Sequence, residues 1–299
     1  MKPGIYYDVP AAEYHADCAD GVSFSASIGN TLITQSPYHA MLEHPKLNKA
    51  PRVRDYSKEA AFGTVAHSVL LGKDADTIAV LDFADFRTNA AKDARDTFVA
   101  AGVTPILKAD MTRAVEMVAA STAQLDKIAD VRSLATREGK AEVTVIWERD
   151  GLPMRCRIDW LPDDHATVID YKTTTESANP SLVARRLHGT GADLSAAHYV
   201  DGLAYHGIHI NTMHFVVQEA EPPYMLSSVA FDGEAMEYAR KKLARARSLW
   251  AMCLRANKWP GYPTRTCWIG VPGWAKYRED EQLVGDDWIR QAYVDFQKP

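Results

Sequence analysis

The chain has 299 residues, of which 46% are hydrophobic and 24% charged, and its formal net charge at pH 7 is −5. This length and composition suit one large or two small globular domains and exclude fibrous and disordered proteins. No apolar run reaches membrane-spanning length, the start Met1-Lys2-Pro3-Gly4 lacks the apolar part of a signal peptide, and the acidic balance excludes a global basic field. We therefore expect a cytoplasmic protein without a membrane partner, in which any nucleic-acid channel is only locally basic.

Two helices are predicted near the N-terminus. Residues 23–27 form an N-cap pattern before an apolar segment at 28–33, which predicts a short helix that ends near Ser36-Pro37. Residues 60–72 have the apolar spacing and terminal glycine of a buried helix, with His67 in its middle. A histidine on an apolar helix is more often a hydrogen-bonded core residue than a ligand, so both interpretations stay open at this point.

The segment 73–139 has a mostly polar helical pattern. Its apolar residues recur at spacings of about three and four, with a break at 102–105. No group of catalytic residue types occurs in it, so we interpret it as a helical elaboration.

Three antiparallel strands are predicted next, at 142–148, 154–161 and 167–173. The turn residues at 150–151 and 162–164 separate runs rich in β-branched and aromatic residues. Side chains two residues apart share one face of a strand, so Asp170 and Lys172 project together. Pairing through the second turn then brings Asp159 close to Asp170.

Two carboxylates at the middle of a sheet need compensation, because like charges repel and lose hydration there. A divalent cation such as Mg²⁺ or Mn²⁺ suits hard carboxylate oxygens, and Lys172 could contact the anion that the cation binds. The alternative is an Asp–Lys ion pair on a solvated face. We favour the site, because Asp170 follows an apolar pair and lies at hairpin distance from Asp159.

The rest of the chain continues the α/β pattern. Helical patterns at 182–187 and 196–205 precede two strands at 214–219 and 224–231, which would extend the sheet. A helix capped by Asp232 continues to about residue 256 and is followed by a tail rich in Trp, Gly and Pro at 257–299. Arg185 could contact phosphates, although exposed arginines more often form a solvated face.

Four short blocks of the sequence resemble one family of proteins. The (D/E)-x-K tripeptide at 170–172 with Asp159 before it resembles the PD-(D/E)XK nuclease superfamily. The S-x-S and S-P-x-H strings at 25–39, F-G-T-x-x-H at 62–67 and Y-x-D-G at 199–202 resemble RecE-like (exonuclease VIII-type) phage exonucleases, which are distantly similar to lambda exonuclease. Ser195 stands where that family has Gln.

The resemblance implies a fold and a set of site residues. The fold is an α/β, restriction-endonuclease-like PD-(D/E)XK core with a central mixed sheet flanked by helices and helical elaborations, in a single domain over 1–299. The implied metal ligands are His67, Asp159, Asp170 and the Tyr171 carbonyl. The implied catalytic residues are Lys172, Asp159, Asp170 and Glu142. The candidate substrate contacts are Tyr199, Ser195, Arg185 and Arg157.

The implied activity is an Mg²⁺-dependent or Mn²⁺-dependent exonuclease that digests linear double-stranded DNA from 5′ to 3′ in phage-type recombination. The implied partners are DNA ends, a single-strand annealing recombinase and further copies of the chain in a ring. The four cysteines are scattered without a cluster, so we expect no iron–sulfur cluster. The alternatives are a catalytically weak DNA-end-binding or assembly module with the same fold, and a RecB-like or CRISPR-adaptation-like nuclease subunit.

Overall fold

The computed structural model describes residues 1–48, 56–210, 212–273 and 275–276. The chain forms two compact units, Met1–Gly261 and Tyr262–Pro299. Every named helix and strand lies in the first unit. Most of the tail that the sequence analysis places at 257–299 lies outside the described residues.

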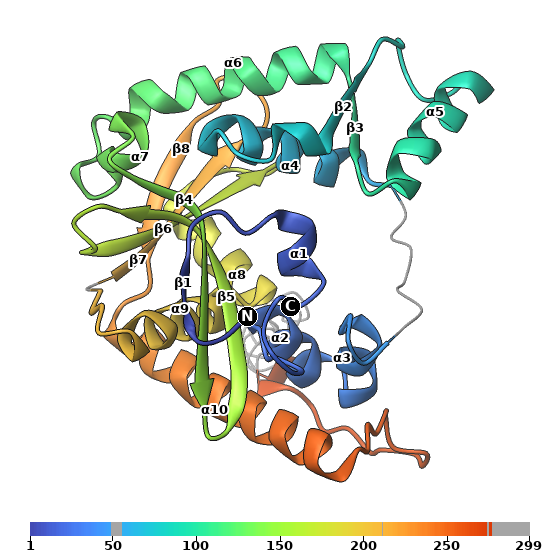
Figure 1. Cartoon of the computed structure of the whole chain (residues 1–299), viewed down its shortest axis with the longest axis vertical. Coiled ribbons are helices and arrows are strands. Elements are labelled where there is room, and N and C mark those ends of the chain that lie inside the picture. Colours follow the sequence, from blue (N-terminus) through green and yellow to red (C-terminus); the bar gives the residue numbers. More distant parts are fainter. Residues whose placement is uncertain (49–55, 211, 274, 277–299) are drawn as a thin grey trace, which may run out of the picture. The chain divides into compact units, whose positions relative to one another are not determined.

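A six-stranded mixed sheet forms the centre of the first unit, with the strand order β1-β4-β5-β6-β7-β8 (Figure 1). Strands β6 and β7 run parallel, and the other neighbouring strands run antiparallel. The strands are β1 (Gly4–Tyr6), β4 (Gly139–Arg149), β5 (Leu152–Pro162), β6 (Thr167–Thr174), β7 (Thr212–Glu219) and β8 (Leu226–Ala230). The three predicted antiparallel strands and the two that extend them are confirmed. Strand β1 was not foreseen, because three residues are too few for a periodic pattern.

Helices pack against the sheet in two hydrophobic cores. The first core contains apolar residues of α2, α8, α9 and α10 with Val143, Val145 and Trp147 of β4. The second contains residues of α4, α6 and α7 with Ile169 and Tyr171 of β6. The helices are α1 (Ala11–His15), α2 (Ala26–Thr34), α3 (Pro37–Glu43), α4 (Lys58–Leu71), α5 (Asn89–Ala100), α6 (Lys108–Leu125), α7 (Arg132–Thr136), α8 (Pro180–Thr190), α9 (Ala192–Tyr205) and α10 (Gly233–Ala256). Across the described residues, no helix combines the length and apolar character needed to cross a bilayer.

The segment 73–139 is less helical than the sequence predicts. Strands β2 (Ile78–Leu81) and β3 (Thr104–Leu107) pair in parallel and form a separate two-stranded sheet between the helices. Each strand has four residues, which is too short to show a period of two against the surrounding helical pattern.

His198 of α9 is buried in the first core. Its Nε2 lies 3.0 Å from the carbonyl oxygen of Arg155, and its Nδ1 lies 3.0 Å from Nη2 of Arg247. Burial, and then the charge of Arg247, lower the pKa of His198 well below its ordinary value of 6.5. The native protein therefore holds this side chain neutral, with Nε2 donating to the carbonyl and Nδ1 accepting from the guanidinium.

We expect the unfolding free energy to fall as the pH drops below about 6.5. A depressed native pKa means that the unfolded chain binds the proton more readily, so stability is retained above the unfolded pKa and lost below it, by about 1.4 kcal/mol per pH unit for one group. A His198→Gln variant keeps a donor and an acceptor but cannot be protonated. Urea unfolding between pH 5 and pH 8 should show a shallower acid slope for this variant, and equal slopes would contradict the assignment to His198.

Candidate active site

The β4–β5 hairpin places two carboxylates across from one another. Val143 pairs with Ile158, and the next position in this antiparallel register sets Glu142 opposite Asp159. Glu142 leaves the ladder and has a φ of 58°, in the left-handed region. This conformation costs a non-glycine residue about 1–2 kcal/mol. Such a cost is typical of functional sites, where the surrounding structure enforces it.

Helix α4 brings His67 to this hairpin. The Ser57 side chain accepts a hydrogen bond from the first turn, and Gly72 ends the helix with a φ of 68°. His67 Nδ1 lies 3.3 Å from Glu142 Oε1, and His67 Nε2 lies 3.1 Å from Asp159 Oδ2. The three side chains offer one ligand atom each within 4.8 Å of one another. We call His67, Glu142 and Asp159 the three-ligand cluster.

A glycine in α4 allows this close approach. A Cβ atom on Gly63 would lie 2.9 Å from Oγ1 of Thr173 in β6. Real Cβ contacts are longer, so a side chain here would require either the Thr173 hydroxyl or the helix to shift. The glycine of the F-G-T-x-x-H string therefore lets α4 pack against Thr173 without such a shift.

Strand β6 adds the other predicted residues. The register of β5 and β6 sets Asp170 opposite Asp159. The backbone N–H of Tyr171 donates to Asp159 Oδ2 at 2.9 Å, and Lys172 Nζ lies 2.6 Å from Asp170 Oδ2. The predicted proximity of the two aspartates and the lysine is present in the structure. Asp170 lies outside the three-ligand cluster and pairs with Lys172 instead.

Opposite charges set the protonation of the three-ligand cluster. Burial alone would lower the pKa of His67, but the carboxylates of Asp159 and Glu142 outweigh it and raise that pKa to about 9. Burial tends to raise the pKa of Asp159, and the His67 and Lys172 charges outweigh it, so the net shift is downward. Burial is the largest influence on Glu142 and raises the pKa of its carboxyl group. In the metal-free protein, a protonated His67 thus occupies the position between two carboxylates.

The Asp170–Lys172 pair is also shifted by burial. Asp170 is 5% exposed, and burial raises the pKa of its carboxyl group to about 6 against the opposing charge of Lys172. Burial would lower the pKa of Lys172, but Asp170 and Asp159 outweigh it and raise that pKa. Lys172 is therefore a cation throughout the working pH range of proteins, and its side chain is 40% exposed.

Arg157 holds Glu142 in place. Its Nε binds Glu142 Oε2, its Nη1 donates to the carbonyl oxygen of Val9 at 2.9 Å, and its Nη2 lies 3.3 Å from Asp74 Oδ2. Arg157 was predicted to contact substrate. In the structure its guanidinium positions a carboxylate of the site.

A cavity of about 590 Å³ opens over the three-ligand cluster. Tyr171, Lys172 and the predicted substrate contacts Arg157 and Tyr199 line it. Among the further lining residues that sequence reasoning did not place at the site are Tyr14, Ser27 and Asp74. Tyr14 and Asp74 lie outside the strings that carry the family resemblance, so the sequence offers no signal for them. Ser27 belongs to the S-x-S string, whose serines could have been taken together as a lining pair.

Two predicted substrate contacts lie elsewhere. The Ser195 hydroxyl donates to the carbonyl oxygen of Gly191 at 3.5 Å, and Arg185 is exposed on α8. Neither is among the described residues that line the cavity.

The Y-x-D-G block of α9 also has a packing role. A Cβ atom on Gly202 would lie 2.7 Å from the indole ring of Trp147, so the glycine lets α9 approach β4 closely. Asp201 binds Arg149 at the hairpin turn and Arg247 of α10. The block therefore joins the β4–β5 hairpin to α9 and α10.

A family comparison agrees with this site. The family described as "PDDEXK-like domain of unknown function (DUF3799)" matches residues 31–267. The chain belongs to this family. The match begins within α2, covers α3 to α10 and includes every predicted site residue. Among curated proteins, none matches the sequence significantly.

One solved structure shares the fold of this chain. The crystal structure of a proposed exonuclease from Eubacterium rectale superposes with a TM-score of 0.57 at 12% identity, over 89% of this chain and 96% of that chain. A phage-related exonuclease from Haemophilus somnus 129PT gives a TM-score of 0.28 at 14% identity, over 64% of this chain and 95% of that chain. The family and the first likeness confirm the predicted PD-(D/E)XK fold, with its central mixed sheet flanked by helices.

Proposed function

We propose that the protein is a divalent-metal-dependent exonuclease that hydrolyses phosphodiester bonds of linear double-stranded DNA. The observation that carries the proposal is the three-ligand cluster beside the Asp170–Lys172 ion pair. The PDDEXK-like family and its fold support a nuclease of this kind.

The residues of the site fit a hard divalent cation. Two carboxylates and one imidazole converge, and protonated His67 and Arg157 supply the positive charge that balances Glu142 and Asp159 in the metal-free protein. Carboxylate oxygens suit Mg²⁺ and Mn²⁺, and an imidazole ligand favours Mn²⁺ of the two. When bound, such an ion lowers the pKa of a bound water and neutralises charge that develops on the scissile phosphate.

Side chains of three sequence segments would bind the cation. His67, Glu142 and Asp159 would hold the cation, and the resemblance adds Asp170 and the Tyr171 carbonyl as further ligands. The left-handed backbone at Glu142 and its contact with Arg157 orient one of these carboxylates.

Lys172 is placed for the reacting phosphate. Its ammonium group lies beside Asp170, lines the cavity and is partly exposed, so it can reach an anion there. It would orient the attacking water and stabilise the negative charge of the pentacovalent phosphorane. Tyr199 faces the same cavity and would contact the substrate strand. We propose that Arg185 and Ser195 contact the substrate away from the scissile phosphate, because neither residue lines the active-site cavity.

The family resemblance adds a direction of digestion, an oligomeric state and a protein partner to the proposal. We propose 5′ to 3′ digestion in phage-type recombination, by a ring-shaped homo-oligomer that hands its product to a single-strand annealing recombinase. A ring would keep each copy on its substrate strand.

Linear duplex DNA labelled at either the 5′ or the 3′ end tests the activity directly. With Mg²⁺ or Mn²⁺, we expect early release of the 5′ label, late release of the 3′ label, resistance of covalently closed circles and no digestion in EDTA. Digestion of circles would indicate an endonuclease instead. Tight binding of DNA ends without label release under all metal conditions would favour the end-binding module.

Gly63→Ala should slow digestion by about tenfold or more, because a small displacement of His67 disturbs the aligned site. The added methyl group meets Oγ1 of Thr173, so Thr173→Ala should relieve the contact. We therefore expect Gly63→Ala to cost much less in a Thr173→Ala background than in the wild type. Rates of digestion of the four proteins check this, and an equal cost in both backgrounds would show that Thr173 is not the obstacle.

A further inference from the structure

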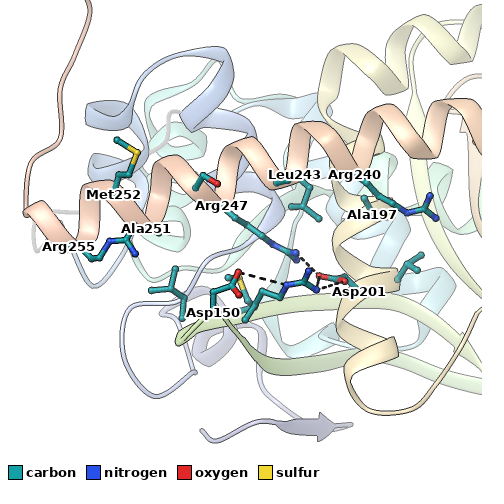
Figure 2. A pocket seen from close by; sticks show the side chains of 15 residues that line it. Asp150, Ala197, Asp201, Arg240, Leu243, Arg247, Ala251, Met252 and Arg255 are labelled. Atoms are coloured by element: carbon teal, nitrogen blue, oxygen red, sulfur yellow. Dashed lines mark hydrogen bonds and ion pairs between the residues drawn. The ribbon is translucent and has the colours of Figure 1, made fainter.

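A second cavity, of about 620 Å³, lies between α9, α10 and the turn of the β4–β5 hairpin (Figure 2). Its charged side chains are four arginines and two aspartates, with no lysine among the described lining residues: Arg149, Arg240, Arg247, Arg255, Asp150 and Asp201. The lining is thus positive in a chain whose net charge is −5. We call this cavity the arginine groove.

Asp201 fixes two of the four arginines. Arg149 Nη1 lies 3.1 Å and Arg247 Nη1 lies 2.5 Å from its carboxylate, and Arg247 Nη2 also lies 3.0 Å from His198 Nδ1. Figure 2 shows Arg247 pointing from α10 towards Asp201. One carboxylate therefore serves two guanidinium groups, which leaves the floor of the groove positive and rigid.

The other two arginines are exposed. Arg240 and Arg255 stand at the two ends of the lining part of α10, and within the described residues neither makes an ion pair (Figure 2). Fifteen residues of α-helix separate them, a rise of about 22 Å. The residues that line the groove between them include the small side chains Ala244, Ser248 and Ala251. These leave the helix surface open between the charges.

We propose that the arginine groove binds the phosphate backbone of a DNA strand that extends from the active site. Arginine presents a planar fork of donors that matches phosphate oxygens, and its weak hydration favours such contacts over lysine. A rise of about 22 Å corresponds to about six phosphates along one strand of B-form DNA. The inference rests on the proposed function for the identity of its ligand.

The length of strand β4 sets the distance between the active site and the arginine groove. Glu142 of the three-ligand cluster and Arg149 of the groove lie on the same strand, β4, seven residues apart. Seven strand residues span about 23 Å, which equals the rise of about seven base pairs. Along β5, Met154 lines the groove and Arg157 lines the active-site cavity, and these residues are three apart and so project to opposite faces of the strand. The duplex must therefore pass around the hairpin as well as along it, and it must extend beyond about seven base pairs from the cleaved end before it can occupy the groove.

Binding as a function of duplex length tests the proposal. The full chain in EDTA, which prevents cleavage, is titrated with blunt hairpin duplexes of 6 and 30 base pairs. The double variant Arg240→Ala/Arg255→Ala should bind the 30-base-pair duplex roughly tenfold more weakly at moderate salt, with a salt slope smaller by about two, because two phosphate contacts are lost. Its affinity for the 6-base-pair duplex should match that of the wild type.

Arg245→Ala provides the matched control. Arg245 is exposed on the same helix but does not line the groove, so its loss should leave the affinity for both duplexes unchanged. If the double variant binds the long duplex as tightly as the wild type, the proposal is overturned. A loss of binding to polyglutamate without any loss for DNA would also overturn it, in favour of an acidic protein partner. If length-dependent binding requires the groove but no DNA is cleaved with Mg²⁺ or Mn²⁺, the proposed exonuclease function is wrong. The arginine groove is then still a DNA-binding site.

Discussion

Asp170→Asn is expected to abolish digestion of linear duplex DNA while the unfolding free energy at pH 8 stays equal to that of the wild type or rises above it. The loss of activity should be about 10³-fold or more, since removal of one group that stabilises the transition state costs several kcal/mol. Stability is retained because Asp170 is buried, and burial disfavours the ionised carboxylate that the substitution removes.

The sign of the stability effect comes from the pKa of Asp170. Burial raises it from 3.8 to about 6, so the native state favours the protonated form. The stability that the proton contributes is present below pH 3.8 and lost as the pH rises through 6. At pH 8 the ionised carboxylate therefore costs on the order of 3 kcal/mol, and this net cost already includes the favourable charge of Lys172. Asparagine keeps the shape and removes this charge.

The measurement compares urea unfolding and digestion for the wild type, Asp170→Asn and the control Asp163→Asn. Asp163 is exposed in the turn after β5, so its substitution should change neither property. An Asp170→Asn protein that is inactive because it is unfolded would contradict the prediction, as would one that digests DNA at the wild-type rate.

The proximity of Asp159 and Asp170 could be predicted from sequence because it depends on local signals. Turn residues at both ends of β5 fix the register, and alternation then decides which side chains share a face. The same reasoning placed α4 and its glycine, since a cap and an apolar period mark the helix. Such features are encoded within about thirty residues.

The rest of the site depends on contacts between distant segments. The left-handed backbone at Glu142 has no counterpart in the strand pattern around it. Tyr14 reaches the cavity after β1 pairs with β4, and Asp74 meets Arg157 across 83 positions of sequence. The buried partners of Arg157 could not be seen in the sequence for the same reason, and its predicted contact with substrate stays a prediction. Ser195 was selected by its position in a string, and Arg185 because it follows the strand that carries Asp170 and Lys172. Neither criterion gives the direction of a side chain.

Asp159→Asn and Lys172→Met are each expected to reduce digestion by about 10³-fold or more, but for different reasons. Asp159 belongs to the three-ligand cluster, so its loss should weaken binding of the cation itself. Lys172 lies outside the cluster and carries a positive charge, so its loss should remove stabilisation of the phosphorane and leave cation binding intact or stronger.

The thermal shift produced by Mn²⁺ separates the two roles. A ligand that binds only the native state raises the melting temperature with concentration. We expect Mn²⁺ to raise the melting temperature of the wild type and of Lys172→Met, and to have little effect on Asp159→Asn. Both variants should also be inactive at saturating Mn²⁺. If Lys172→Met loses the thermal shift while Asp159→Asn keeps it, the two residues have been assigned the wrong way round, and the cation lies at Asp170 and Lys172 rather than at His67, Glu142 and Asp159.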